Sequence, residues 1–200
     1  IGTAASAAGT GTLGGTLTAS TASGVATFTN LSLTGTAGNF TLNFSAAPLT
    51  SVTSGAIALT AGAPAALAFQ VQPSNVASGA SIAPAVQVRV VDGAGNLVGT
   101  VTNSVTLSLA SNPSGGVLGG TLTTAAVAGV ATFSTLTIDR AGTGYALGAA
   151  GAGLTPATSA AFNVTAGAAT RLAFLTQPTT TTAGTALSPA VQVEILDAVG

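Results

Sequence analysis

The feature that most limits what this chain can fold into is an internal repeat with a period of 105 residues. The segment LAFQVQPSNVASGASIAPAVQVRVVD (Leu67–Asp92) returns as LAFLTQPTTTTAGTALSPAVQVEILD (Leu172–Asp197) without insertion or deletion. LGGTLT, at Leu13 and again at Leu118, has the same spacing, and so does GVATF. Solenoid repeats run to about 20 to 50 residues and cannot fold singly, so a longer period indicates tandem domains.

The repeat divides the chain into three predicted segments. Residues 1–61 are the C-terminal part of one domain, residues 62–166 are a complete domain, and residues 167–200 are the N-terminal part of a third. A unit of this length is large enough to bury its own core without a metal or a disulfide. The sequence contains no Cys and no His, so neither is expected.

Charged side chains are scarce, and this excludes several classes of function. They make up 4% of the chain, with three Arg and no Lys, against about 25% in an average protein. Nucleic acids and anionic membranes are bound by clustered cations, so neither is an expected partner. No apolar run approaches the roughly 18 residues that a transmembrane helix needs, so no membrane insertion of this segment is expected.

The complete segment shows alternating and β-branched patterns rather than the helical period, which predicts strands throughout. In Ala85–Asp92, for example, every second residue is Val. The seven predicted strands, A to G, are residues 66–72, 85–92, 104–109, 118–123, 129–138 with a kink near 132–135, 143–149 and 159–165.

Short strands at intervals of about ten residues, with turn residues between them, are typical of a two-sheet sandwich. The predicted fold class is therefore all-β, with tandem immunoglobulin-like sandwiches of about seven strands in each 105-residue repeat. Short links, such as residues 60–64, predict that neighbouring domains lie nearly end to end as a semi-rigid rod.

Residues 1–12 match the repeat less closely and are expected to hold the end of strand C and a longer C–D loop. Two interpretations of the incomplete outer segments stay open. The chain is either a window onto a longer array, or a protomer whose half-domain is completed by strands of the next protomer, which would form a head-to-tail fibre.

Five motifs carry a family resemblance: LAFxxQP, AGxxxxPAVQVxxxD, LGGTLT, GVATF and AGTGYxL. With them the chain resembles the tandem bacterial immunoglobulin-like (Big-type) repeats of large secreted and surface proteins, in the style of invasin and intimin stalks. The resemblance covers essentially all 200 residues. It implies a sandwich fold and an extracellular or cell-surface stalk, adhesin or filament, and it carries no catalytic residues. The depletion of Lys, Asp and Glu differs from charged, calcium-stiffened adhesin repeats.

Few residues are candidates for chemistry, and each has an ordinary structural interpretation. Asp92 and Asp197 end strand B in their repeats; a calcium site needs six or more oxygens, so a turn cap is favoured over a ligand, even with Asn96 nearby. The string Gly9–Gly14 matches a dinucleotide fingerprint, but a strand follows it where that motif needs a helix. Ser and Thr are abundant, yet a nucleophile needs a base, and the chain has no His or Lys.

Four further expectations concern the remaining polar residues. Asp139 and Arg140 are expected as a solvated pair at the E–F turn. Tyr145, the sole tyrosine, is expected as a corner tyrosine bonded to the main chain. N-glycosylation is open at the Asn-x-Ser/Thr strings, and O-linked sugar is equally open; the strings are at Asn30, Asn39, Asn43 and Asn163.

The sequence thus predicts a structural repeat module of an extracellular stalk or filament, with no catalytic, cofactor or metal residues. An adhesin whose repeats bind a carbohydrate or protein is the alternative. Sugar and protein binding surfaces usually expose Tyr or Trp, and this chain has no Trp and one Tyr. Expected partners are neighbouring repeats or identical protomers, with a surface glycan as a further candidate.

Overall fold

The computed structural model describes residues 2–6 and 11–200, with side chains described from residue 11 onward. Within these residues the regular elements are β-strands and none is a helix, which confirms the predicted all-β fold. By their contacts the residues form two compact units. Unit 1 is Ile1–Ala66 with Val90–Val101, and unit 2 is Leu67–Arg89 with Thr102–Gly200. The predicted segments 1–61, 62–166 and 167–200 are defined by sequence similarity and stay a prediction.

A three-stranded sheet that lies mostly in unit 2 has the order β11-β13-β17. These strands are β11 (Ala66–Val71), β13 (Val86–Val91) and β17 (Val130–Phe133). They correspond to predicted strands A, B and the first half of E. Alternation orients them as expected: Val86 and Val88 are fully buried, whereas Gln87 between them is half-buried.

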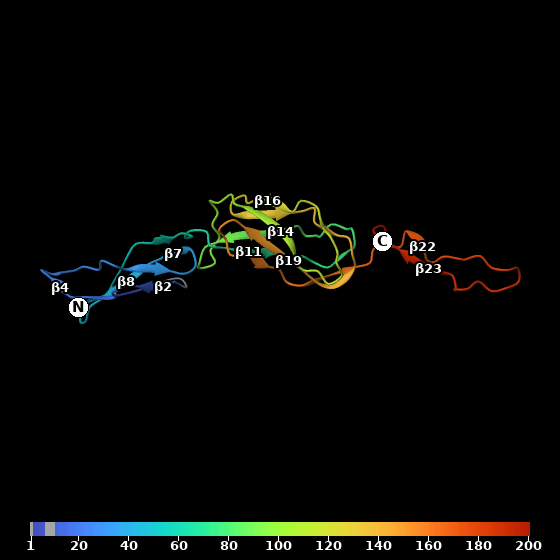
Figure 1. Ribbon diagram of the computed structural model, residues 1–200. Coiled ribbons are helices and arrows are strands. Elements are labelled where there is room, and N and C mark those ends of the chain that lie inside the picture. Colours follow the sequence, from blue (N-terminus) through green and yellow to red (C-terminus); the bar gives the residue numbers. More distant parts are fainter. Residues whose placement is uncertain (1, 7–10) are drawn as a thin grey trace. The chain divides into compact units, whose positions relative to one another are not determined.

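A second sheet of unit 2 has the order β12-β21-β19-β14-β16, with β20 also pairing β19 (Figure 1). Its strands are β12 (Val76–Ala77), β14 (Ser104–Ser111), β16 (Thr123–Ala125), β19 (Gly142–Gly151), β20 (Ala157–Thr158) and β21 (Phe162–Thr165). The central neighbours β14, β19 and β21 are predicted strands C, F and G. This grouping of A, B and E against G, F and C is the one expected for an immunoglobulin-like sandwich.

The two sheets of unit 2 share an apolar core. Its fully buried large side chains come from both sheets and from the segments that connect them: Ile82, Val86, Val88, Val105, Leu107, Phe133, Leu136, Ile138, Tyr145 and Leu147. Each such side chain contributes about 1.5 to 3 kcal/mol by leaving water. A core of this size offsets much of the chain-ordering entropy without any cross-link.

Predicted strand D is broken in two, which corrects the sequence interpretation. Strand β15 (Leu118–Gly119) pairs with β18 (Thr137–Ile138) as a separate two-stranded sheet, whereas β16 pairs with β14 in the larger sheet. Gly120 lies at the break with φ +94°, and a Cβ there would lie 2.1 Å from the carbonyl oxygen of Thr135. Predicted strand E is likewise interrupted, between β17 and β18, close to the residues where a kink was expected.

Unit 1 contains shorter strands of the same kind (Figure 1). They are β1 (Gly2–Ser6), β2 (Thr12–Gly14), β3 (Thr18–Ala19), β4 (Thr21–Ala22), β5 (Val25–Ala26), β6 (Ser32–Thr34), β7 (Gly38–Phe40), β8 (Leu42–Ser45), β9 (Val52–Thr53) and β10 (Ile57–Leu59). The sheets are β3-β1-β8-β9, β10-β7, β2-β6 and β4-β5.

The sequence repeat is also a repeat of strand pairing. Leu13 faces Leu33 in the β2-β6 pair, and 105 residues later Leu118 faces Ile138. Ile57 faces Phe40 just as Phe162 faces Tyr145. GVATF follows the same hairpin turn in both repeats, with positive φ at Ser23–Gly24 and at Ala128–Gly129.

Strand β1 is the equivalent of β14, because Ala4 faces Phe44 as Leu107 faces Ala149. This confirms that the first residues hold the end of strand C. The predicted longer C–D loop includes residues 7–10, which lie outside the described residues.

The last two strands are β22 (Arg171–Thr176) and β23 (Gln192–Leu196), which pair with each other. They are the equivalents of β11 and β13, as the repeat predicts. Among the described residues no helix is long and apolar enough to cross a bilayer.

Candidate functional site

The junction between successive repeats is built around the aspartate that ends strand B. Strand β13 stops at Val91, and the Asp92 carboxylate then accepts hydrogen bonds on Oδ1 from the backbone N–H groups of Ala94 and Asn96, at 2.9 and 2.8 Å. This confirms the predicted turn cap. Its Oδ2 accepts two more, from the Gly62 N–H at 2.8 Å and from the Asn96 side-chain amide at 2.9 Å.

The Gly62 bond was not predicted, because Gly62 lies 30 residues before Asp92 in the link between repeats. Asp92 is only 6% exposed, yet all its hydrogen bonds favour the charged form. The Asn96 amide is the largest cause and the Gly62 N–H the next, and together they lower the pKa of Asp92 from 3.8 to about 2 against the opposing effect of burial.

Asn96 extends the junction to the loop between β6 and β7 of the preceding repeat. Its side-chain amide nitrogen donates to the Gly35 carbonyl at 3.0 Å, and its side-chain oxygen accepts from the Ala37 N–H at 2.7 Å. Both ends of one amide are therefore used to hold a loop about 60 residues away in sequence.

The same arrangement recurs 105 residues later. The Gly167 N–H donates to Asp197 Oδ2 at 2.8 Å, and the N–H groups of Val199 and Gly200 donate to Oδ1 at 3.0 and 2.9 Å. Ser78 of the middle repeat adds a bond from its hydroxyl to Asp197. That bond is the largest cause of a lowered pKa at Asp197. We call Asp92 and Asp197 the junction aspartates.

The calcium interpretation gains no support from this geometry. Both oxygens of Asp92 are already faced by N–H donors, which a cation would have to displace. In the described part of the chain, no three acidic side chains gather as a metal site would need.

The predicted corner tyrosine is confirmed, and for Asp139 and Arg140 the predicted position at the E–F turn is confirmed while their pairing stays a prediction. The Tyr145 hydroxyl donates to the Arg140 carbonyl oxygen at 3.0 Å, and the ring is fully buried, so Tyr145 is a corner tyrosine. Asp139 and Arg140 do lie in the turn between β18 and β19. The Asp139 carboxylate also accepts from the Val117 N–H at 2.6 Å, a contact that the sequence did not reveal.

The Gly9–Gly14 string begins in residues outside the described part of the chain, and it ends in strand β2 instead of entering a helix. The glycosylation strings stay a prediction. At Asn30 the side-chain amide is already used, since it donates to Thr16 Oγ1 at 3.0 Å and accepts from the Thr16 N–H at 2.9 Å.

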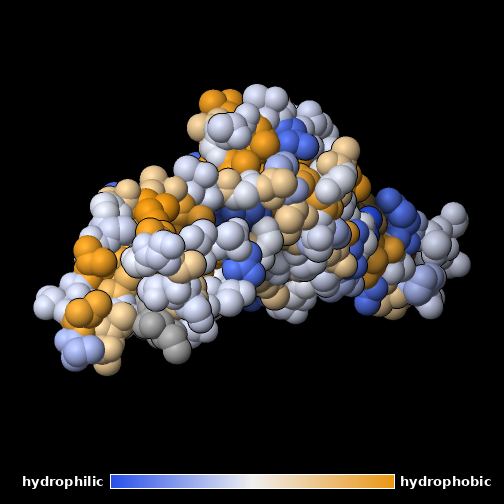
Figure 2. All heavy atoms as spheres, turned by 90° about the vertical axis from the view of Figure 1, so that its left-hand side faces the viewer, coloured by the Kyte–Doolittle hydropathy of each residue, from blue (hydrophilic) through white to orange (hydrophobic). Residues whose placement is uncertain are grey.

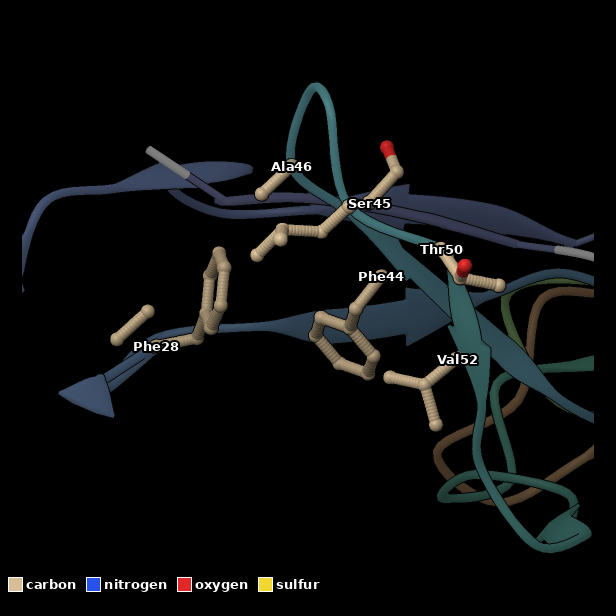
Figure 3. A pocket seen from close by; sticks show the side chains of 8 residues that line it. Phe28, Phe44, Ser45, Ala46, Thr50 and Val52 are labelled. Carbon is tan, nitrogen blue, oxygen red and sulfur yellow. The ribbon is translucent and has the colours of Figure 1, made fainter. Parts of the chain in front are cut away.

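An apolar groove in unit 1 was missed by sequence reasoning. It has a volume of about 410 Å³ and is lined by Ala26, Phe28, Phe44, Ser45, Ala46, Leu49, Thr50 and Val52. The Phe28 and Phe44 rings lie with centroids 5.3 Å apart and point into it (Figure 3). Figure 2, which faces the end of the molecule on the left of Figure 1, shows orange hydrophobic residues among pale residues of intermediate hydropathy. The repeat could have indicated this groove, because Phe28 is the equivalent of Phe133, which is fully buried in the middle repeat.

Comparison with known proteins identifies no family: no family model and no curated protein matches the sequence. Similar solved structures include a beta-glycosidase from Bacteroides vulgatus (TM-score 0.44, 15% identity, 68% of this chain and 18% of that chain). Others are a glycosyl hydrolase family 2 member from Bacteroides cellulosilyticus (0.43, 11%, 63% and 17%) and domains 4-9 of the surface layer protein SbsC (0.37, 16%, 100% and 28%). The chain spans under a third of each of them, and at these TM-scores the likenesses carry no argument about function.

Proposed function

We propose that this chain is a structural part of a tandem array of Big-type immunoglobulin-like repeats, serving as an extracellular or cell-surface stalk or filament. The observation that carries the proposal is the recurrence of the junction. Gly62 N–H to Asp92 and Gly167 N–H to Asp197 are the same bond, at the same 2.8 Å, one period apart. An array whose task is reach needs each link to be held in the same way.

The chemistry of the described residues supports a role without catalysis. The Ser159 hydroxyl, which is buried, accepts from the Leu147 N–H at 2.9 Å and donates to the Ala160 carbonyl, so it supports a strand. Ser54 makes the equivalent bonds in the first repeat. A serine used twice in this way is a structural feature of the repeat.

An adhesin is the alternative, because the Phe28 and Phe44 rings offer an apolar surface. Against it stands the burial of Tyr145, which leaves no tyrosine or tryptophan for a sugar-binding platform. Binding of the 200-residue chain to a glycan array would favour the adhesin.

The proposal is tested by measuring how freely two neighbouring repeats move. Because the chain has no Cys, spin labels can be attached at Thr29→Cys and Ser134→Cys, which are equivalent exposed positions in two repeats. We expect a narrow distribution of distances between the labels, and a broader one after Asn96→Ala. Asn112→Ala is the matched control, since the Asn112 amide bonds only within its own turn, to Gly116. A broad distribution in the unsubstituted chain would contradict a stalk.

A further inference from the structure

Two segments of the middle repeat, residues 72–78 and 160–167, run side by side in the same direction. Their backbones pair as the parallel strands β12 and β21, over two residues of each. The Ser78 N–H continues this pairing with a bond to the Thr165 carbonyl at 2.8 Å. Along its other edge β21 pairs with β19, so the C-terminal segment is anchored in the larger sheet.

Three polar side chains of the N-terminal segment extend this pairing. They lie three residues apart, and each accepts a hydrogen bond from a backbone N–H of the C-terminal segment. Gln72 Oε1 accepts from Ala160 at 2.9 Å, Asn75 Oδ1 from Asn163 at 2.7 Å, and Ser78 Oγ from Gly167 at 3.0 Å. We call these three bonds and the β12-β21 pairing the clamp; all its residues lie in unit 2.

The clamp lies on the path that tension along the chain would follow. The chain enters the clamp at Gln72 and leaves it at Gly167, and the two segments are parallel. A pull on both ends of the repeat therefore slides one segment past the other and strains all the bonds of the clamp together. A pull across the segments breaks the same bonds one at a time. Resistance to a pull depends on the rate of unfolding, and bonds that must break together raise that barrier together.

Ser78 joins the clamp to the link that carries the chain into the next repeat. Its hydroxyl accepts from the Gly167 N–H and donates to the junction aspartate Asp197. The same Gly167 N–H also donates to Asp197 Oδ2 at 2.8 Å. The link and the clamp are thus held by one set of hydrogen bonds.

From this geometry we propose that the middle repeat bears tension along the chain through the clamp. The inference rests on the proposed stalk or filament role, which supplies the tension. The two fail separately, because the spin labels report motion between repeats, whereas the clamp determines how strongly a single repeat resists unfolding.

Single-molecule force spectroscopy of the 200-residue chain tests the proposal. Because the chain has no Cys, handles are attached at Ala63→Cys and Ala169→Cys, exposed positions on either side of the middle repeat. Unfolding of this repeat is recognised by a gain in length on the order of 350 Å, the extended length of about 105 residues. At constant force we expect Asn75→Ala and Ser78→Ala each to unfold roughly fivefold faster than the unsubstituted chain, as the loss of a hydrogen bond implies.

Asn112→Ala is the matched control. The Asn112 side chain also accepts from a backbone N–H, that of Gly116 at 2.8 Å, but it lies outside the clamp. Its rate of unfolding under load should stay within about twofold of the unsubstituted chain. Urea denaturation shows that each variant folds, and the loss of stability should be no larger for Asn75→Ala, whose side chain is exposed, than for Asn112→Ala. Equal rates under load for Asn75→Ala and the unsubstituted chain would overturn the proposal.

The direction of the pull gives a second test, which needs no change in the clamp. Handles at Ala80→Cys and Ala169→Cys follow the same end of the two parallel segments, so a pull between them opens the clamp bond by bond. At the same force the repeat should open at least roughly tenfold faster than when it is pulled from Ala63 and Ala169. Equal rates in the two directions would show that the clamp does not bear the load.

Discussion

The Asp92 carboxylate accepts hydrogen bonds from the turn that follows β13 on one oxygen and from Gly62 and the Asn96 side chain on the other. At the scale of the residue, the link to Gly62 therefore depends on Oδ2 being a hydrogen-bond acceptor. A backbone N–H and an amide nitrogen both point at Oδ2, so only an acceptor is tolerated there.

We therefore expect Asp92→Asn to weaken the hydrogen bond from Gly62 more than the hydrogen bonds from Ala94 and Asn96 in the turn. An asparagine keeps an oxygen for Ala94 and Asn96, but places an amide nitrogen against the Gly62 N–H. Protection of the Gly62 amide from hydrogen exchange should fall roughly tenfold. Glu194→Gln removes the same charge without a hydrogen bond at stake and is the control. Equal exchange at Gly62 in all three chains would show that the carboxylate does not hold the link.

The lowered pKa of Asp92 gives the junction a defined pH dependence. The pKa of Asp92 is about 2 in the folded chain, against an ordinary value of 3.8 without these hydrogen bonds. The stabilisation of the folded state by the charged carboxylate is therefore fully present above pH 3.8 and is lost as the pH falls through 2. We expect the amide resonance of Gly62 to be unchanged from neutral pH to about pH 4 and to titrate with a midpoint near pH 2. A midpoint near 3.8 would mean that the hydrogen bonds do not form in solution.

The sequence predicts the hydrogen bonds of one Asp92 oxygen but not those of the other. The turn cap on Oδ1 of Asp92 is local, and the DGAGN turn sequence indicates it. The bond from Gly62 to Oδ2 joins residues 30 apart, and Asn96 reaches Gly35 from 61 residues away. Single-sequence patterns carry no information about such pairs. Comparison of Asp92 with Asp197 could have suggested that both serve the same contact, because Gly62 and Gly167 share the period.

At the scale of the element, alternation predicts strands well where one face is buried. Predicted strand A (66–72) is β11, and predicted strand B (85–92) is β13, each within one residue at either end. Strand D was predicted as one element and is two, because Gly120 turns the chain from the β18 partner to the β14 partner. Strand β12 was missed, since a two-residue parallel pairing with β21 leaves no pattern in the sequence.

The break in strand D gives a test of the element. Gly120 has φ +94°, and a Cβ would lie 2.1 Å from the Thr135 oxygen, which is backbone and cannot rotate away. We expect Gly120→Ala to reduce the free energy of unfolding by about 3 kcal/mol, measured by urea denaturation. Gly93→Ala is the control, because a Cβ there meets nothing within 4 Å; its effect should stay within about 1 kcal/mol. A small loss at Gly120 would show that β15 and β16 tolerate a different turn.

At the scale of the whole molecule, equivalent residues of two repeats differ in burial. The predicted sandwich is complete where a repeat has all its strands, so that Phe133 is buried. The equivalent Phe28 is half-buried and lines a groove, and within the described residues β5 pairs only with β4. Composition could not reveal this, since Phe28 and Phe133 lie in the same GVATF motif. Their environments differ only in what pairs beside them.

The scarcity of charge sets the salt dependence of the molecule's stability. With 4% charged residues, folding relies little on screened electrostatics. We expect the midpoint of urea denaturation to change little between low salt and about 1 M sodium chloride. Sodium sulfate at equal ionic strength should raise the midpoint, because sulfate strengthens the burial of apolar surface. A large loss of stability in sodium chloride would mean that the few charged side chains contribute more to folding than their number suggests.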